Sequence, residues 1–268
     1  MGARNWLIHP VIATAIVINI GVLALAVAWS GPDPTLLWRL LGEDGIVEWM
    51  QFLTFTVLAA LLGFIAVERW KSHPVWTLEL LALGGLSLVV ALAALEEISW
   101  FQRVLDVQSP EFFLEKNRQA ETNLHNLALG SGSIHKTIML KAIFIVGMLH
   151  NLILPLMARS RPAIKRWIES VGLYLPPLPA AIAYLVLVAL SHLLIDHPRK
   201  GELGEMFGAT HYLATVFAAY VVGVGYGKPP VFENVADRRR VSTLCVLALL
   251  FLMMVGWILS SGTGATGA

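Results

Sequence analysis

Residues 77–98 read TLELLALGGLSLVVALAALEEI, an apolar run that ends on two adjacent glutamates. Between Glu79 and Glu96 the run contains no charged residue. A helix needs about 20 predominantly apolar residues to cross the hydrocarbon core of a bilayer, so the run predicts a transmembrane helix. Its two terminal carboxylates, Glu96 and Glu97, would lie at the edge of the bilayer, where ionisable groups are costly and usually mark function.

The composition extends this prediction to the whole chain. Of 268 residues, 57% are hydrophobic and 14% are charged, and the mean hydropathy is +0.70, whereas soluble domains carry about 25% charged residues. We predict an all-α fold, a polytopic membrane helix bundle forming one integral membrane domain over residues 1–268, with a flexible tail at residues 260–268. The net charge of +1 offers no basic face to a nucleic acid, and the single cysteine, Cys245, excludes an internal disulfide.

About seven apolar segments are long enough to be transmembrane helices. The first could instead be a signal peptide, but its apolar run exceeds the usual 7–15 residues or so, and we expect a retained helix. Eleven of the 19 Lys and Arg residues fall on the side of the membrane that holds Arg4, which predicts a cytoplasmic N-terminus and a non-cytoplasmic C-terminus. The expected spans are residues 6–29, 47–67, 77–98, 138–157, 179–195, 205–226 and 241–259.

The connection between the third and fourth spans, residues 99–137, is long for a helix bundle. Ser109-Pro110-Glu111 suits a helix start, because Ser is a good N-cap and Pro is tolerated at the first helical position. We expect an amphipathic or re-entrant helix over residues 110–129, ending at the Gly-Ser-Gly-Ser run of residues 130–133. In such a helix Glu121 and His125 would share a face.

Carboxylates and imidazoles gather at the non-cytoplasmic end of the predicted bundle. His211 would lie about 9 Å deeper than Glu205, at a rise of 1.5 Å per residue. Neutral imidazole and carboxylate together suit a divalent Zn, Fe or Mn ion, and closely spaced carboxylates also suit proton transfer. The candidate metal ligands are Glu97, Glu121, His125, His192, Glu205 and His211, and the candidate catalytic residues are Glu97, Glu121 and His125.

Each of these residues also has a structural interpretation. Glu48 and Glu205 stand in the first turn of a helix, where a carboxylate complements the helix dipole. His192 and His211 could be hydrogen-bonded histidines of the core, and the Glu96-Glu97 pair could be neutralised by Arg103.

Several blocks of the sequence resemble an uncharacterised family of bacterial multi-pass membrane proteins, which implies a bacterial inner-membrane location and a shared site without naming an activity. The resemblance covers roughly residues 43–205, and it leads us to expect a small residue, typically Gly, where this chain has Phe101. The blocks are Glu43-Asp44-Gly45-x-x-Glu48-Trp49, Glu96-Glu97-Ile98-Ser99-Trp100-x-Gln102-Arg103, Pro110-Glu111-Phe112-Phe113 and Glu121-Thr122-Asn123-Leu124-His125-Asn126.

A more distant, architectural likeness is to the alkaline ceramidase-type seven-helix hydrolases, which resemble this chain in helix count and in intramembrane Glu, Ser, Asp and His. Those enzymes carry Ser-x-x-x-His within a helix and a late His-x-x-x-His. Here Ser131 and His135 have the first spacing, but in a Gly-rich stretch, and the seventh span has no histidine.

Three functions follow as hypotheses. The first is a metal-dependent hydrolase that acts on a lipid or lipid-linked substrate at the outer leaflet, with membrane lipids as partners. The second is a non-catalytic subunit or assembly factor that docks a membrane protein partner. The third is a proton-coupled transporter, which the absence of an inverted repeat disfavours.

Overall fold

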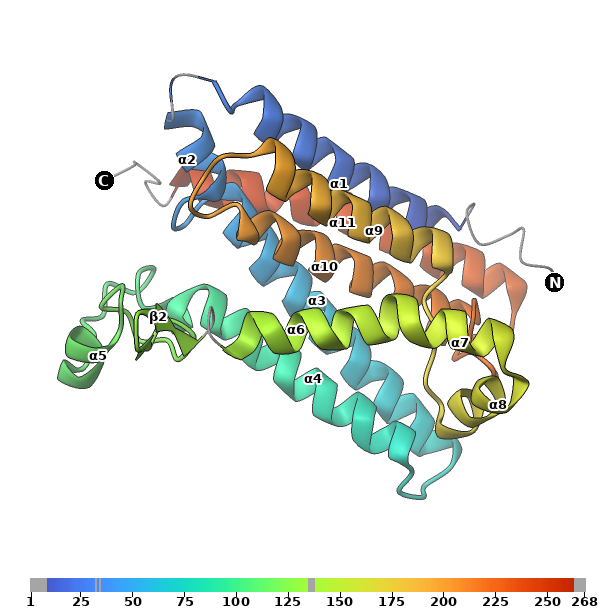
Figure 1. The fold of residues 1–268 in the computed structure, drawn as a ribbon. Helices are drawn as coiled ribbons and strands as arrows, with labels where there is room; N and C mark the ends of the chain where they lie inside the picture. The colour runs from blue at the N-terminus through green and yellow to red at the C-terminus, as the bar shows by residue number, and fades with distance from the viewer. Residues whose placement is uncertain (1–8, 32, 34, 135–137, 263–268) are drawn as a thin grey trace.

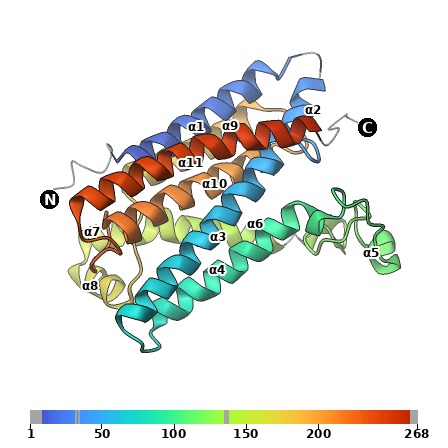
Figure 2. The ribbon, with the colours of Figure 1, turned by 180° about the vertical axis from the view of Figure 1, so that it is seen from behind.

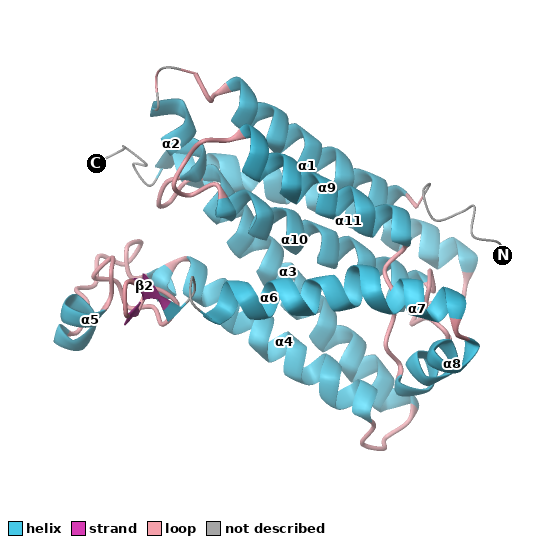
Figure 3. Cartoon of the chain, in the orientation of Figure 1, coloured by secondary structure: helices cyan, strands magenta, loops and turns pink. Residues whose placement is uncertain are grey.

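The computed structural model of this chain describes residues 9–31, 33, 35–134 and 138–262. Apart from one β-hairpin with two residues in each strand, its regular elements are helices, and the all-α prediction is confirmed (Figure 3). The helices lie side by side in an elongated bundle, and α1 begins at the opposite end from the one where α11 ends (Figure 1). The predicted seventh span runs on to Gly262, and residues 263–268 of the expected tail, like Arg4 and His135, lie outside the described residues.

Five stretches of helix are long and apolar enough to cross a membrane, which supports a multi-pass membrane protein. The sixth expected span forms α10 and continues into the π-helical segment η5, and the fifth forms α9, which has 17 residues. Between them lies a charged connection. The long elements are α1 (Pro10–Ala28), α3 (Ile46–Ser72), α4 (Leu78–Glu97), α6–η4–α7 (Leu140–Met148, Leu149–Ile153 and Leu154–Ser160), α9 (Leu178–Leu194), α10–η5 (Gly201–Val216 and Phe217–Val222) and α11 (Val235–Gly262), with the shorter α2 (Thr35–Leu41) and α8 (Pro162–Val171).

The centre of the bundle is α10, which packs against α1, α3 and α9. Most of its side chains are buried, including Phe207 and the polar Thr210. The Thr210 hydroxyl donates to Asn19 Oδ1 of α1 at 2.6 Å, and Asn19 Nδ2 donates to the Phe207 carbonyl at 3.2 Å. Because neighbouring helices satisfy its polar groups, α10 tolerates a less apolar sequence than the helices that face lipid.

The other helices surround α10 unequally. From behind, α11 lies along α1 and α3 (Figure 2). α4 packs mainly on α3, where the Ser87 hydroxyl donates to the Ala59 carbonyl at 2.8 Å, and it exposes Leu88 and Val89. None of the side chains of α6 is buried. These exposed apolar faces suit contact with hydrocarbon rather than water.

Residues 99–134 project beyond the end of α4 (Figures 1 and 3). The helix expected over residues 110–129 is short: α5 spans only Glu111–Lys116, and a hairpin of β1 (Ala128–Leu129) and β2 (Gly132–Ser133) follows. The reason is Asn117, whose side chain donates to the Asn123 carbonyl and accepts from the Gln119 amide. Asn side chains bonded in this way offer the backbone an alternative to the helix, so Glu121 and His125 do not share a helical face.

The chain leaves α4 through a left-handed turn. Ser99, Trp100 and Phe101 have φ angles of 47°, 57° and 61°, and the Phe101 and Gln102 amides donate to the carbonyls of Ile98 and Ser99 at 3.0 Å. This conformation costs a non-glycine residue roughly 1–2 kcal/mol. A glycine in place of Phe101 would remove that cost, whereas any other small residue would not.

Phe101→Gly and Phe101→Ala separate this strain from side-chain packing. Both substitutions remove the edge-to-face contact with Phe52, whose ring centroid is 5.5 Å away, but only glycine relieves the left-handed backbone. We expect the glycine variant to be more stable than the alanine variant by about 1 kcal/mol in unfolding experiments in detergent. The control is Leu88, an exposed position within α4, where the alanine variant should be more stable than the glycine variant. At Phe101, a glycine variant that is less stable than the alanine variant would contradict the backbone strain.

Candidate functional site

Arg103 is the centre of an ion cluster at the projecting end of the bundle. Its Nε lies 3.0 Å from Asp44 Oδ2, its Nη2 lies 2.6 Å from Glu48 Oε1, and its Nη1 lies 2.5 Å from Glu121 Oε1. These four side chains are between 9% and 20% exposed. The planar guanidinium presents its donors in a fixed fork, and here it joins the start of α3, the turn after α4 and the loop that holds Glu121.

The cluster has more negative than positive groups. Burial alone would lower the pKa of Arg103, but the nearby carboxylates, Glu48 first and then Glu121, raise it above its ordinary value. The guanidinium therefore stays charged, and a single positive charge is shared by three carboxylates.

Hydrogen bonds from residues near Arg103 fix the loop around Glu121. The Ser99 hydroxyl donates to Glu121 Oε2 at 2.5 Å, and Asn123 Nδ2 donates to Ser99 Oγ at 2.8 Å. Gln102 accepts from the Thr122 amide at 2.6 Å. The strained turn thus places Ser99, Gln102 and Arg103 together on the loop, and backbone strain of this kind persists where the surroundings over-determine it, often at functional sites.

Glu96 rather than Glu121 is the partner of His125. Glu96 Oε2 accepts from the Leu124 amide at 2.6 Å and the His125 amide at 3.1 Å, and it lies 3.3 Å from His125 Nδ1. Glu96 Oε1 accepts from Trp100 Nε1 at 2.8 Å. A carboxylate beside an imidazole fixes its tautomer and orientation, so His125 is held at the loop surface and Glu121 belongs to the Arg103 cluster.

Glu97 faces a different group of charges. Its carboxylate lies near enough to Glu205, Glu202 and Glu48 for their charges to act on it, with Arg199 the nearby positive group. Among the described residues, no hydrogen bond or ion pair joins Glu97. Adjacent residues of a helix point about 100° apart. Glu96 and Glu97 therefore meet different groups at the same end of α4.

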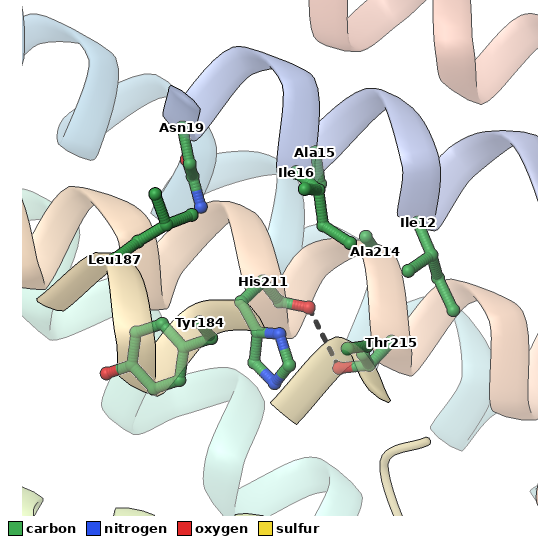
Figure 4. A pocket seen from close by; sticks show the side chains of 10 residues that line it. Ile12, Ala15, Ile16, Asn19, Tyr184, Leu187, His211, Ala214 and Thr215 are labelled. Atoms are coloured by element: carbon green, nitrogen blue, oxygen red, sulfur yellow. Dashed lines mark hydrogen bonds between the residues drawn. The ribbon is translucent and has the colours of Figure 1, made fainter. Parts of the chain in front are cut away.

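The two remaining candidates, His192 and His211, lie elsewhere. His192 Nδ1 bonds the Val188 carbonyl within its own helix at 3.0 Å. His211 is buried in the bundle, with Nε2 2.8 Å from Asn151 Oδ1 and its ring stacked on Tyr184 at 4.8 Å. A cavity of about 10 Å³ adjoins His211 (Figure 4), enough for roughly one water. His211 thus fits the interpretation of a hydrogen-bonded core histidine, whereas His192 is hydrogen-bonded but exposed.

The six candidate metal ligands therefore do not meet at one point. Glu97 and Glu205 are neighbours, Glu121 is bound to Arg103, His125 is bound to Glu96, and the other two histidines are apart. Across the described part of the chain, no three His, Cys, Asp or Glu side chains come close enough to share a metal ion. The donor set does not fit the predicted metal site, and we derive no chemical step through a metal.

The sequence offered Arg103 only as a partner for Glu96 and Glu97, whereas the structure pairs it with other carboxylates, and Asp44, Ser99 and Asn123 were left out of the predicted site. All four stand in the blocks that carry the family resemblance, so a signal was present. At the opposite end, Glu79 binds Lys228 at 2.6 Å, Arg69 at 3.5 Å and the Tyr226 hydroxyl, in an ion cluster that had no place in the prediction.

Comparison with protein-family models, curated proteins and solved structures found no match for this chain. Membership of the uncharacterised bacterial family and the likeness to the ceramidase-type hydrolases therefore stay predictions.

Replacing Arg103 by methionine tests the ion cluster. Methionine keeps much of the apolar stem but leaves three partly buried carboxylates without a cation, and we expect a loss of about 3–5 kcal/mol in the free energy of unfolding. The control is Arg240→Met, which breaks a longer and more exposed pair with Asp237 at 3.6 Å and should cost at most about 1 kcal/mol. Equal losses for the two variants, measured by unfolding in detergent, would contradict a central role for Arg103.

Proposed function

We propose that this chain is a membrane-embedded hydrolase that acts on a lipid or lipid-linked substrate at the non-cytoplasmic face. The observation that carries the proposal is the set of groups around the Glu97 carboxylate. Glu48 is bound to Arg103, whereas Glu97 has no hydrogen-bond or ion-pair partner among the described residues, and the charge of Glu205 acts on it. An ionisable side chain without such a partner at the end of a membrane bundle is suited to proton transfer.

Glu97 and Glu205 would work as a pair. Two nearby carboxylates lose their protons in separate steps, because the charge on one opposes ionisation of the other. The ionised member accepts a proton from the attacking water, and the protonated member donates a proton to the leaving oxygen, as in general acid–base hydrolysis. The proton balance closes, because water supplies the hydroxyl and the proton that the two products gain.

The Arg103 cluster and His125 have supporting roles in this proposal. Arg103 holds Glu48 and Glu121 in fixed positions, so that the backbone between α4 and the loop does not move during the reaction. His125 lies between Glu96, 3.3 Å from its Nδ1, and Asn126, 2.9 Å from its Nε2, and helps to hold the loop. Of the three predicted catalytic residues, Glu97 keeps that role in the proposal, and Glu121 and His125 are positioning residues.

Orientation and location remain part of the proposal. We place the N-terminus in the cytoplasm and the C-terminus outside, in a bacterial inner membrane, from the distribution of Lys and Arg in the loops. The Glu79 cluster would then lie at the cytoplasmic end and the Arg103 cluster at the non-cytoplasmic end.

A non-catalytic subunit is the second candidate function. Residues 99–134 expose apolar side chains, among them Leu105 and Val107 at 67% and 56%. Exposed apolar patches on a projecting segment suit a protein partner in the membrane as well as a lipid surface. Purification in a mild detergent that returns a stable complex, with the lipid activity residing in the partner, would favour this function.

The hydrolase proposal is tested with purified protein in vesicles made from the lipid extract of its source membrane. Mass spectrometry of the lipids before and after incubation should detect a hydrolysed product, and Glu97→Gln and Glu205→Gln should each lower the rate at least 100-fold, as expected for loss of a general acid or base. Glu115→Gln, an exposed acid of α5, is the control and should keep the rate. Full activity in the Glu97→Gln variant would overturn the proposal.

The same preparation decides whether a metal takes part. Bound Zn, Fe or Mn near one ion per chain, with activity lost on chelation and restored by that ion, would reinstate the metal-dependent hydrolase of the sequence prediction. Activity that survives chelation supports the carboxylate pair.

A further inference from the structure

The helix α8 lies directly after a candidate membrane span and has one buried and one charged side. Only Arg161 separates it from α7, which completes the span Leu140–Ser160. Ile168 of α8 is 2% exposed, whereas Lys165 and Arg166 are exposed. A basic amphipathic helix at the end of a span suits the interface between hydrocarbon and water.

Contacts with the bundle fix the position of α8. The helix ends at Gly172, which has a left-handed φ of 73° and leaves no room for a Cβ beside the Glu79 carboxylate. The Gly172 carbonyl accepts from the Tyr220 hydroxyl at 3.1 Å. Glu79 is in turn bound to Lys228 at 2.6 Å. Because its C-terminal end is attached to this ion cluster, α8 presents its charged side in a fixed orientation.

Three exposed arginines of this segment have no acidic partner. They are Arg159 at the end of α7, Arg161 between the helices and Arg166 on α8, and we call them the α7–α8 arginines. No hydrogen bond or ion pair joins their side chains to another described residue. Lys165, the fourth cation within these eight residues, lies 3.7 Å from Glu169 Oε1. Unpaired guanidinium groups suit the oxygens of a phosphate, which they bind with two parallel N–H donors.

Exposed tryptophans surround the same end of the bundle. Trp167 of α8 is 57% exposed. The contact of Gly172 with Glu79 places α8 beside the start of α4, and Trp76, just before α4, is 71% exposed. Tryptophan is enriched where a membrane protein meets the lipid headgroups. The α7–α8 arginines are therefore at the depth where the phosphates of the lipids lie.

The two ends of the bundle differ in charge. Residues 67–79, 158–174 and 226–240, at the end that holds α8 (Figure 1), contain ten Lys or Arg and five Asp or Glu. At the other end, residues 30–48, 96–134 and 195–205 contain six Lys or Arg and thirteen Asp or Glu. An excess of positive charge raises the local concentration of anions, so the end that holds α8 favours an anionic ligand.

An apolar stripe leads from the hydrocarbon region to Arg159. Leu156 and Ile153 precede Arg159 at intervals of three residues, which places the three side chains close to one face of the helix. Leu156 is 45% exposed and Ile153 is 40% exposed. A lipid chain can lie along this stripe while its headgroup meets the arginines, and a soluble anion has no such contact.

We propose that the α7–α8 arginines bind the headgroup of an anionic phospholipid, whose chains lie along α7 beside Leu156. The site is at the opposite end of the bundle from Glu97, and binding depends on neither Glu97 nor turnover. It would give the protein a preference for membranes rich in anionic lipid, whatever reaction the other end performs.

The test measures lipid binding by native mass spectrometry on the full-length protein in detergent. Phosphatidylglycerol is compared with phosphatidylcholine of the same chain length, and glycerol 3-phosphate, which has the phosphate but no chains, is added as a competitor. We expect phosphatidylglycerol to bind at least about tenfold more tightly, because each Lys or Arg near an anionic lipid adds attraction. Glycerol phosphate should compete only at concentrations at least about tenfold above that of the lipid.

Variants assign the preference to the α7–α8 arginines. Replacing all three by glutamine should bring the two lipids to within about twofold of each other, because the unpaired charges are gone. Arg166→Glu, a single reversal on the exposed side of α8, should lower the preference several-fold. The matched control removes three exposed cations from the other end of the bundle and should keep the preference: Arg39→Gln, Lys116→Gln and Arg118→Gln.

Three results would overturn the proposal. One is phosphatidylcholine binding as tightly as phosphatidylglycerol. Another is a triple glutamine variant at the α7–α8 arginines, or an Arg166→Glu variant, that retains both its unfolding temperature and the wild-type preference. The third is competition by glycerol phosphate at the same concentration as the lipid, which would make the ligand a soluble phosphate.

Discussion

The shared charge of Arg103 is the interaction on which the projecting end of this protein depends. Asp44 lies just before α3, Glu48 stands in its first turn, and Glu121 comes from a loop far along the chain, and one guanidinium binds all three. Removing one partner of a buried ion pair leaves an uncompensated charge, so the four side chains form a unit. The left-handed turn at residues 99–101 is the local cost of bringing Arg103 to that position.

This arrangement divides the carboxylates of the site into two classes. Asp44, Glu48 and Glu121 share the single positive charge of Arg103 and serve structure. Glu96 and Glu97, adjacent in sequence, are directed to different sides: Glu96 toward His125, and Glu97 toward Glu205. One helix end thereby supplies both a carboxylate that fixes the loop and a candidate acid–base residue.

The sequence predicted the membrane bundle well because apolar length is a direct physical requirement for crossing lipid. α4 was expected at residues 77–98 and spans Leu78–Glu97. Counting the spans also predicted which carboxylates gather at one end of the bundle. The end of one span and the start of the next lie on the same side of the membrane, and this places together Glu48, Glu97, Glu121 and Glu205. The helix predicted over residues 110–129 was too long. It ends early because the Asn117 side chain bonds the backbone of the following loop, and helical propensity does not predict such bonds.

The pairing of charges within the site was beyond sequence reasoning. Glu121 and His125 have helical spacing, but the chain between them is not helical, and His125 pairs with Glu96 instead. Three consecutive left-handed residues, one of them a phenylalanine, follow no local propensity, and only the tertiary bonds of Ser99 and Arg103 account for them.

The most direct measurement of the account is a double-mutant cycle between Arg103 and Glu121. The free energies of unfolding of Arg103→Met, Glu121→Gln and the double variant are compared with that of the wild type in the same detergent. If Arg103 holds the loop through this pair, the losses are not additive, and the coupling energy is about 2 kcal/mol, within the range for residues that share an ion-pair network. Losses that add to within about 0.5 kcal/mol would show that the two side chains act independently, and would contradict the account.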